Sequence, residues 1–120
     1  MSSKKKILIV NSWENFATPI IATFPDFEVV SATTAEEGKN AFELHKDSIA
    51  LVVVGTLVNV GMGQPPLSLP LVRHIKEVSS IPVVGMTIIS KFEAMFREAG
   101  CDDVCAQQKL CVTVGRYLGT

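Results

Sequence analysis

The residues with the most reactive side chains are three cysteines and two histidines, and their spacing does not suit a metal centre. Cys101, Cys105 and Cys111 include no C-x-x-C pair, and His45 and His74 stand alone. Structural zinc sites use closely paired thiolates together with histidine. An odd number of cysteines without such a pair is typical of a cytosolic protein. We therefore expect no metal here and interpret the cysteines as small buried hydrophobic residues.

Other catalytic patterns are also incomplete. Ser12 and Thr56 carry hydroxyls, but no His, Cys or Lys stands nearby in the sequence to act as a base. Gly61 and Gly63 form a Gly-x-Gly pair that lacks the third glycine of a dinucleotide-binding fingerprint and does not follow the first strand. With no nucleophile–base pair and no metal cluster, we expect that the chain is not an enzyme.

The composition fits one compact domain. The chain has 120 residues, of which 48% are hydrophobic and 19% charged, with 11 basic against 12 acidic residues and a net charge of -1. Such a composition excludes a disordered chain, and the balanced charge disfavours nucleic-acid or membrane-surface binding. The longest apolar runs, residues 7–10, 49–55 and 81–86, are far shorter than the roughly 18 residues of a membrane span. We expect one cytoplasmic domain over residues 1–120.

Apolar runs and amphipathic segments alternate along the chain. Unbroken runs rich in β-branched residues, typical of strands buried on both faces, predict strands at residues 7–10, 27–32, 50–54, 82–86 and 104–106. Helical spacing of apolar residues predicts helices at residues 15–24, 34–45, 69–78, 90–99 and 110–118. Alternating strands and helices form a parallel sheet with helices on both faces, because the crossovers are right-handed. The sequence thus predicts a flavodoxin-like doubly wound α/β fold with strand order 2-1-3-4-5.

Local signals refine the helix ends. Thr34 and Ser90 are candidate N-caps, and Gly100 is placed to end the fourth helix. Pro19 falls inside the first helix, which predicts either a late start with Thr18 as the cap or a kink. Gly115 is expected to interrupt the last helix.

In this fold the binding crevice lies beyond the carboxyl ends of the strands. The candidate functional residues are therefore those that follow a strand, namely Asn11, Ser12, Trp13, Glu14, Gly55, Thr56, Thr87, Gln107 and Gln108.

Four segments carry a family resemblance over nearly the whole chain. They are ILIV at residues 7–10 with a polar pair behind it, LVVV at 51–54, IPVVGMT at 81–87 and AGCDD at 99–103. In this order they resemble the response-regulator receiver domain family. The resemblance implies a phosphoacceptor aspartate at the end of the third strand and an acidic pair after the first strand that holds Mg²⁺. It also implies a Ser or Thr after the fourth strand and a Lys after the fifth, which bind the phosphate.

This sequence departs from the family at most of those positions. The phosphoacceptor position is Gly55, and the acidic pair is replaced by Asn11 and Ser12. The hydroxyl position is Thr87, and the lysine position is Gln107. The aromatic residue that switches rotamer in the family falls on Val104, and the proline behind the lysine on Gln108. Only Thr87 matches, and hydroxyls at strand ends commonly tie down a loop.

Other charged residues do not replace the missing ones. Glu14 is the one carboxylate expected near the crevice, Lys109 comes two residues late for the phosphate-binding lysine, and the four aspartates, Asp26, Asp47, Asp102 and Asp103, are expected at the opposite end of the sheet. Because Mg²⁺ prefers carboxylate ligands and phosphoryl transfer depends on the metal charge, we expect both to be lost and no cofactor to be bound.

Two features expected beside the crevice each have two possible roles. The stretch at residues 56–70, with Met62 and several prolines, is longer than the family pattern and is either a partner-binding or crevice-capping loop or a neutral surface insertion. Trp13 either binds a ligand or fills the space left by the lost acids. Trp13, Glu14, Thr56 and Met62 are the candidate ligand or partner contacts.

The resemblance implies a degenerate receiver domain that acts in two-component or phosphorelay signalling by binding another protein. In the family, the surface that begins here at Phe92 and ends at Leu118 often forms the dimer or effector interface, so a homodimer through this region is expected. The alternative is a small-ligand sensor, because the crevice is neutral and polar at its rim and could accept an uncharged or weakly acidic metabolite.

Overall fold

The structure, a computed structural model, describes residues 5–11, 17–57 and 66–119. Its strands are β1 (Lys6–Val10), β2 (Glu28–Ala32), β3 (Ile49–Val54), β4 (Val83–Met86) and β5 (Asp103–Cys105). Its helices are α1 (Ala17–Thr23), α2 (Ala35–His45), α3 (Leu69–Val78), α4 (Ser90–Ala99) and α5 (Leu110–Leu118), with a short 3₁₀ turn, η2 (Gln107–Lys109), before the last. Every predicted strand and helix is thus confirmed. In the described part of the chain, no helix has the length and apolar character to cross a bilayer.

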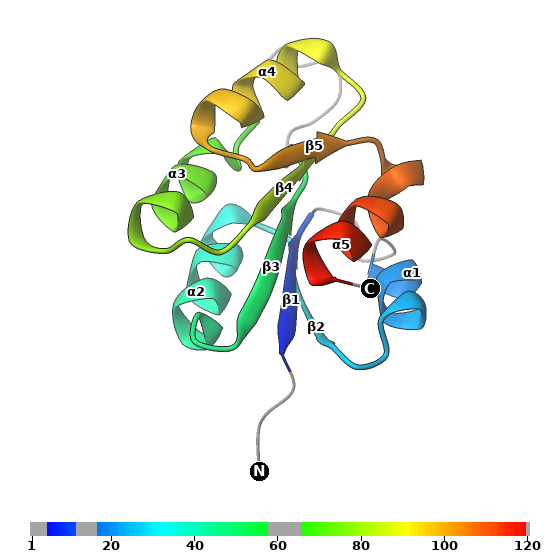
Figure 1. The fold of residues 1–120 in the computed structure, drawn as a ribbon. Coiled ribbons are helices and arrows are strands. Elements are labelled where there is room, and N and C mark those ends of the chain that lie inside the picture. Colours follow the sequence, from blue (N-terminus) through cyan, green and yellow to red (C-terminus); the bar gives the residue numbers. More distant parts are fainter. Residues whose placement is uncertain (1–4, 12–16, 58–65, 120) are drawn as a thin grey trace.

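The five strands form one parallel sheet in the order β2-β1-β3-β4-β5, as predicted. Figure 1 shows α1 and α5 on one side of this sheet and α2, α3 and α4 on the other. The register aligns the strand ends, because Val10 pairs with both Ala32 and Val54, Val54 pairs with Gly85, and Met86 pairs with Cys105. The residues that follow the strands therefore lie along one edge of the sheet, the carboxyl edge.

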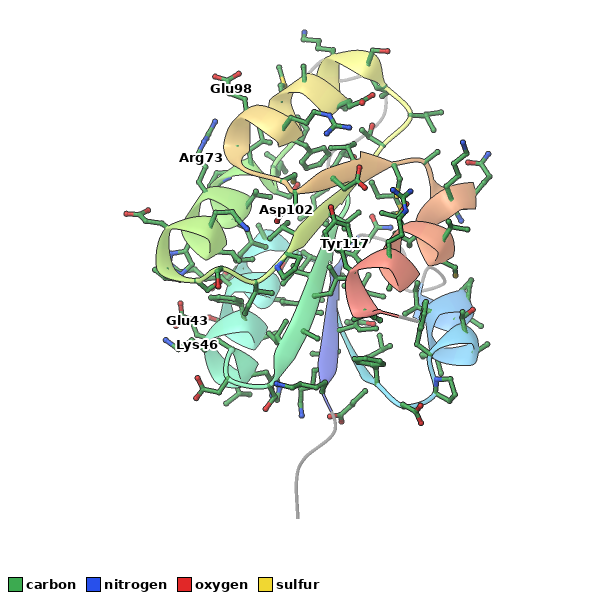
Figure 2. All side chains as sticks on the ribbon, viewed as in Figure 1. Glu43, Lys46, Arg73, Glu98, Asp102 and Tyr117 are labelled. Atoms are coloured by element: carbon green, nitrogen blue, oxygen red, sulfur yellow. The ribbon has the colours of Figure 1, made fainter. Side chains whose placement is uncertain are left out.

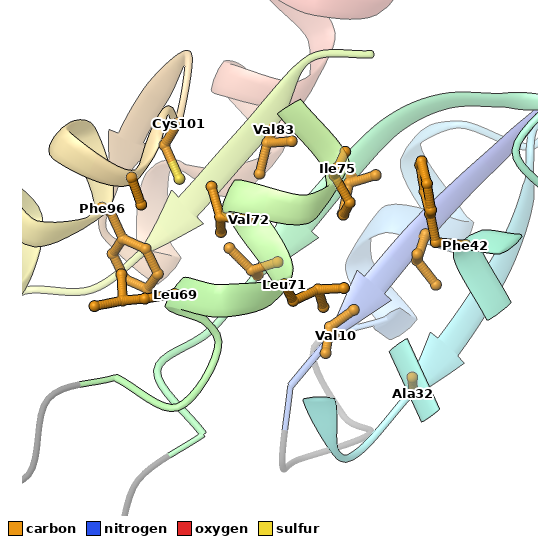
Figure 3. Packing of buried hydrophobic residues seen from close by; sticks show 14 of the residues in the cluster. Val10, Ala32, Phe42, Leu69, Leu71, Val72, Ile75, Val83, Phe96 and Cys101 are labelled. Carbon is orange, nitrogen blue, oxygen red and sulfur yellow. The ribbon is translucent and has the colours of Figure 1, made fainter. Parts of the chain in front are cut away.

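Alternate residues of the central strands supply the two halves of the core. On one face, strand residues such as Val10 pack against α2, α3 and α4, including Phe42, Leu71 and Phe96 (Figure 3). On the other face, strand residues such as Ile9 pack against α1 and α5. Strands buried on both faces need apolar residues at every position, which explains their unbroken apolar sequences.

Gly85 lets α4 approach the sheet closely. It is buried in β4, and a Cβ atom there would lie 2.8 Å from Cγ of Phe96, which is itself fully buried. That distance is too short for carbon atoms, so a side chain at this position would push the Phe96 ring and α4 outward.

Two of the predicted helix ends are confirmed. The hydroxyl of Thr34 accepts a hydrogen bond of 3.1 Å from the backbone N–H of Glu37, as an N-cap does. Gly100 ends α4 in the left-handed conformation with φ of 117°.

Three local predictions were wrong. Ser90 is the first residue of α4 rather than its cap, because the hydroxyl of Thr87 takes the N–H of Ile89 and closes the preceding turn. Thr18 lies inside α1, whose third residue is Pro19; a proline in the first turn costs no helical hydrogen bond. Gly115 is buried within an unbroken α5, where the helix packs on the sheet.

Candidate functional site

Five of the predicted site residues lie at the carboxyl edge. Asn11 follows β1, Gly55 and Thr56 follow β3, Thr87 follows β4, and Gln107 opens the 3₁₀ turn after β5. Ser12, Trp13, Glu14 and Met62 lie outside the described residues.

Asn11 and Gly55 are in direct contact. Gly55 is buried, and its N–H donates a 2.8 Å hydrogen bond to the carbonyl of Val10, the residue before Asn11. The amide group of Asn11 fills the space into which a side chain at residue 55 would project. A Cβ atom on Gly55 would lie 2.9 Å from Cγ of Asn11 and closer still to its Oδ1.

Ser68, which the sequence pattern does not indicate as a site residue, joins the start of α3 to this edge. Its side chain is fully buried, and its hydroxyl donates a 2.6 Å hydrogen bond to the carbonyl of Gly55. A second bond of 2.9 Å joins the N–H of Leu67 to the carbonyl of Thr56, beside Leu57, which has a left-handed φ of 57°. A serine just before a helix usually indicates an N-cap, but here the hydroxyl caps nothing and closes the base of the loop.

Thr87 serves the turn between β4 and α4. Its hydroxyl accepts a 3.1 Å hydrogen bond from the N–H of Ile89, and its own N–H donates to the carbonyl of Cys105 at 3.0 Å. The side chain of Ile88 between them is 81% exposed. In this geometry Thr87 stabilises a turn, the more common role of a strand-end hydroxyl.

The side chains of Gln107 and Gln108 are exposed. Together with Pro19, Leu110 and Cys111 they line a depression of about 270 Å³ between α1 and the start of α5. These lining residues are neutral and mainly apolar, so the depression suits an uncharged molecule better than a phosphate.

The carboxylates of the strand connections are at the other end of the sheet, the amino edge. Asp102, which is labelled in Figure 2, precedes β5. Its Oδ2 accepts hydrogen bonds from the N–H of Val83 at 2.8 Å and from Nζ of Lys76 at 2.9 Å. Asp26 and Asp47 precede β2 and β3. The predicted placement of the aspartates is therefore confirmed. Among the described residues there is no group of three or more His, Cys, Asp or Glu that could hold a metal ion.

The three cysteines are free thiols. Cys101 is buried, and burial raises the pKa of its thiol to about 12. Burial also raises the pKa of Cys105, although this residue and Cys111 are only half-buried. The interpretation as buried hydrophobic residues is thus correct for Cys101, whereas Cys105 and Cys111 reach the surface. The position of the family's switching aromatic, Val104, is buried in the core.

Comparisons with known proteins support the fold. No protein-family model and no curated protein matches the sequence. Solved structures do match: a response regulator receiver domain protein from Clostridium thermocellum has a TM-score of 0.73 at 18% identity, over 96% of this chain and 94% of that chain. A two-component response regulator from Clostridium difficile has a TM-score of 0.71 at 20% identity, over 96% of both chains.

A chain from a CheX–CheY complex with BeF₃ and Mg²⁺ from Borrelia burgdorferi has a TM-score of 0.74 at 14% identity, over 95% of this chain and 89% of that chain. This chain therefore has the fold of receiver domains, at sequence identities that establish the fold alone.

Proposed function

We propose that residues 1–120 form a receiver-like module of two-component or phosphorelay signalling that is not phosphorylated and acts by binding another protein. One observation carries the proposal: in a fold shared with receiver domains, the residue after β3 is Gly55, which has no side chain. The family resemblance places a phosphoacceptor aspartate at this position. A glycine offers no carboxylate oxygen on which a phosphoryl group could be carried.

The surrounding side chains argue in the same direction. Asn11, Thr56, Thr87 and Gln107 are neutral, whereas Mg²⁺ in proteins is usually held through one or two carboxylates. Phosphoryl transfer also needs positive charge around the transferred group, and the lysine position is Gln107. The described residues do not fit a Mg²⁺ site. We therefore propose that this edge binds no Mg²⁺ and catalyses no phosphoryl transfer.

A titration followed by nuclear magnetic resonance tests this proposal. The ¹⁵N-labelled protein is titrated with Mg²⁺ and then with beryllofluoride, and the amide signals of Gly55, Thr56 and Thr87 are followed. We expect no saturable shift. A phosphorylatable receiver domain titrated in parallel confirms that the reagents are active. The fluorescence of Trp13, the single tryptophan, gives an independent signal. Saturable binding by either method would contradict the proposal.

The partner surface that we propose begins at Phe92 and ends at Leu118. Supporting observations are the exposed Val112 on α5 and the two arginines, Arg97 and Arg116, that lie 3.9 Å from Asp103 on β5. Among the similar structures, one is a chain of a protein complex. We propose that a second copy of this chain is one partner of this surface.

Sedimentation velocity tests the homodimer with a matched pair of variants. Val112→Asp should weaken a concentration-dependent dimer, because it places a charge in the contact. Leu44→Asp is the control, because Leu44 is 77% exposed on α2, outside the proposed surface. A wild-type protein that stays monomeric at high micromolar concentration would contradict self-association and leave a different protein as the partner to seek.

The depression beside Gln107 favours a second candidate function, which is binding of a small uncharged ligand. Its volume of about 270 Å³ is close to the roughly 300 Å³ at which ligand pockets begin. A titration with benzamide, a neutral probe with an apolar ring and an amide, would shift the amide signals of Gln107 and Cys111 if the depression binds such molecules. Saturation at those residues alone would favour the ligand sensor over the signalling module.

A further inference from the structure

The sheet also has two lateral edges, which run along its outer strands β2 and β5, and they differ in how they are protected. β5 has three residues, and the N–H of Val104 on it is bound by the carboxylate of Asp103 at 2.8 Å. Arg97 and Arg116 each lie 3.9 Å from the same carboxylate. Short strands and charged side chains are common means by which proteins keep other chains from pairing with a sheet edge. The β5 edge is therefore protected.

β2 has backbone groups that point away from the sheet. The N–H of Glu28 and the carbonyl of Ala32, at the two ends of the strand, both bond to the backbone at the ends of β1, at 2.9 Å. Because successive residues of a strand point their N–H and C=O in opposite directions, those of Val29 and Ser31 face outward. In the part of the chain that the structure describes, no group bonds to them. They form a template for one more strand.

The side chains at the centre of β2 are neutral and only partly covered. Val29 packs against the half of the core below α1 and α5, and Val30 packs against the other half. Both valines are half-buried and Ser31 is exposed, whereas Leu8 in the neighbouring strand is fully buried. An added strand would cover the valines while its backbone pairs with the outward groups, as in other cases of strand addition.

The charge around β2 selects the kind of strand that this edge could bind. From residue 7 to residue 38 the sequence has no Lys, Arg or His, and its charged residues are Glu14, Asp26, Glu28, Glu36 and Glu37. Lys6, just before this stretch, pairs with Glu28 at 2.9 Å, but the Glu28 side chain is still 56% exposed. Asp26 is exposed as well. This edge therefore attracts a basic segment and repels an acidic one.

We infer that the lateral edge of β2 is a docking site for an extended, basic segment of another protein, which adds a strand to the sheet. The backbone of the segment pairs with the outward groups of Val29 and Ser31, and its Lys or Arg side chains are attracted by Asp26 and Glu28. The inference goes beyond the proposed function, because the surface proposed there includes the opposite outer strand, β5.

Amide hydrogen exchange, followed by nuclear magnetic resonance, tests the inference with a peptide probe. The probe is the acetylated peptide Lys-Val-Thr-Val-Thr-Val-Lys, and the control peptide has Glu in place of both Lys residues. In the free protein, we expect the outward N–H groups of Val29 and Ser31 to exchange faster than the inward N–H of Val30. The basic peptide, at about ten times its dissociation constant, should slow exchange at Val29 and Ser31 about tenfold. The acidic peptide should bind about fivefold more weakly at low salt.

A matched pair of variants tests the backbone pairing. Ser31→Pro removes an outward N–H and leaves the bonds to β1 in place, because proline is tolerated on an edge strand where its nitrogen faces solvent. It should weaken binding of the basic peptide about fivefold, as expected for the loss of one hydrogen bond. Ser31→Ala keeps the N–H and should bind the peptide as the wild type does, within about twofold.

Each contrary outcome would overturn the inference. Slow exchange of Val29 and Ser31 in the free protein at every concentration would mean that the edge is already covered. Protection that rises with protein concentration, without peptide, would make a second copy of the chain the occupant. Equal binding of the two peptides would reject the basic segment.

Equal binding of the basic peptide by Ser31→Pro and Ser31→Ala would reject the backbone pairing. If Ser31→Pro does not fold, exchange in the wild-type protein with the two peptides decides. Beryllofluoride binding or the absence of a dimer sensitive to Val112→Asp would contradict the proposed function and leave these results unchanged. The inference and the proposed function can therefore fail separately.

Discussion

The two edges of the sheet are held together by different forces. At the amino edge, Lys6 at the start of β1 pairs with Glu28 at the start of β2, at 2.9 Å. Also there, Asp102 binds Lys76 and the N–H of Val83. At the carboxyl edge, Ser68 and Gly55 are joined by a bond between neutral groups, and the carboxylate of Glu37 accepts hydrogen bonds from the N–H and hydroxyl of Thr33 rather than from a charged group. Among the described residues, no ion pair involves a residue directly after a strand.

This difference indicates that the charged contacts at the amino edge have a structural role. Charged groups that join strands at the amino edge serve the scaffold, where receiver chemistry is not expected. The carboxyl edge is where a phosphoryl group and Mg²⁺ would need carboxylates and a lysine, and its described side chains supply hydrogen bonds and volume instead. The chain thus has the fold of receiver domains, and the residues that directly follow β1, β3 and β4, Asn11, Gly55 and Thr87, are neutral.

The largest predicted difference between the two edges is in the reactivity of their cysteine thiols. Cys101 lies before β5 near the amino edge, and its pKa of about 12 leaves roughly a thousandfold less thiolate at pH 8 than an ordinary cysteine has. A variant that keeps only Cys101 should react with Ellman's reagent about a thousandfold more slowly than the same variant unfolded in urea. A variant that keeps only Cys105, half-buried at the carboxyl edge, is the comparison and should react faster. Equal rates in the folded and unfolded states would contradict the burial of Cys101.

Removal of the Asp102 carboxylate should cause the largest loss of stability at the edges. Asp102→Ala leaves the N–H of Val83 and the amine of Lys76 without their shared acceptor, at an expected cost of about 2 kcal/mol in the free energy of unfolding. Asp102→Asn keeps an acceptor for the N–H and should cost less. Urea unfolding measures both. A cost for Asp102→Ala below about 0.5 kcal/mol would mean that the amino edge does not depend on this carboxylate.

Most of the fold could be predicted from the sequence because it depends on local patterns. The unbroken apolar run of β3 and the amphipathic spacing of α4 each require one kind of element, and their alternation requires a parallel sheet. Errors arose where a contact that residue spacing does not reveal competed with a local signal. Ser90 lost its capping role because Thr87 closes the turn ahead of it, and Gly115 stays helical because it packs in the core.

The site was only partly predictable, for a related reason. The fold rule placed Asn11 and Gly55 at the same edge, but their steric fit depends on the side-chain conformation of Asn11, which the sequence pattern does not specify. Ser68 was missed because its partner, the carbonyl of Gly55, is 13 residues away. A buried hydroxyl that bonds to backbone is invisible to spacing arguments, since any serine before a helix suggests a cap.

Removal of the Ser68 hydroxyl should lower the free energy of unfolding by less than removal of the Asp102 carboxylate, and the loss should not depend on salt. Ser68→Ala leaves the carbonyl of Gly55 without this buried bond, at an expected cost of about 1 kcal/mol. Ser79→Ala at the other end of α3 is the control, because the carbonyl of Ile75 that its hydroxyl binds also accepts the N–H of Ser79. The cost for Ser68→Ala should not change with salt, whereas that for Asp102→Ala should shrink in high salt. A salt-dependent cost at Ser68 would contradict the comparison between the edges.

The smallest effect is expected from Glu43, at the end of α2 that lies toward the amino edge. Its carboxylate contacts Nε2 of His74 at 2.7 Å and Nζ of Lys46 at 3.5 Å, and Figure 2 shows it beside Lys46. The hydrogen bond with His74 lowers the pKa of Glu43 below its ordinary 4.5. A lowered pKa in the folded state means that the contribution to stability is complete above about pH 4.5 and is lost as the pH falls through the folded value.

Glu43→Gln should therefore unfold at a slightly lower temperature than the wild type at pH 7, and the two melting temperatures should converge below pH 4.5. Glu98→Gln, on the exposed surface of α4, is the control for removal of a charge. Melting curves between pH 3 and 7 provide the measurement. If the difference between wild type and Glu43→Gln grew as the pH fell, the carboxyl group would be stabilising in its protonated form, and the hydrogen bond from His74 to the ionised Glu43 carboxylate would have to be rejected. Convergence would show that the bond between Glu43 and His74 is lost in acid. This bond lies toward the amino edge, as the ion pair between Lys6 and Glu28 does.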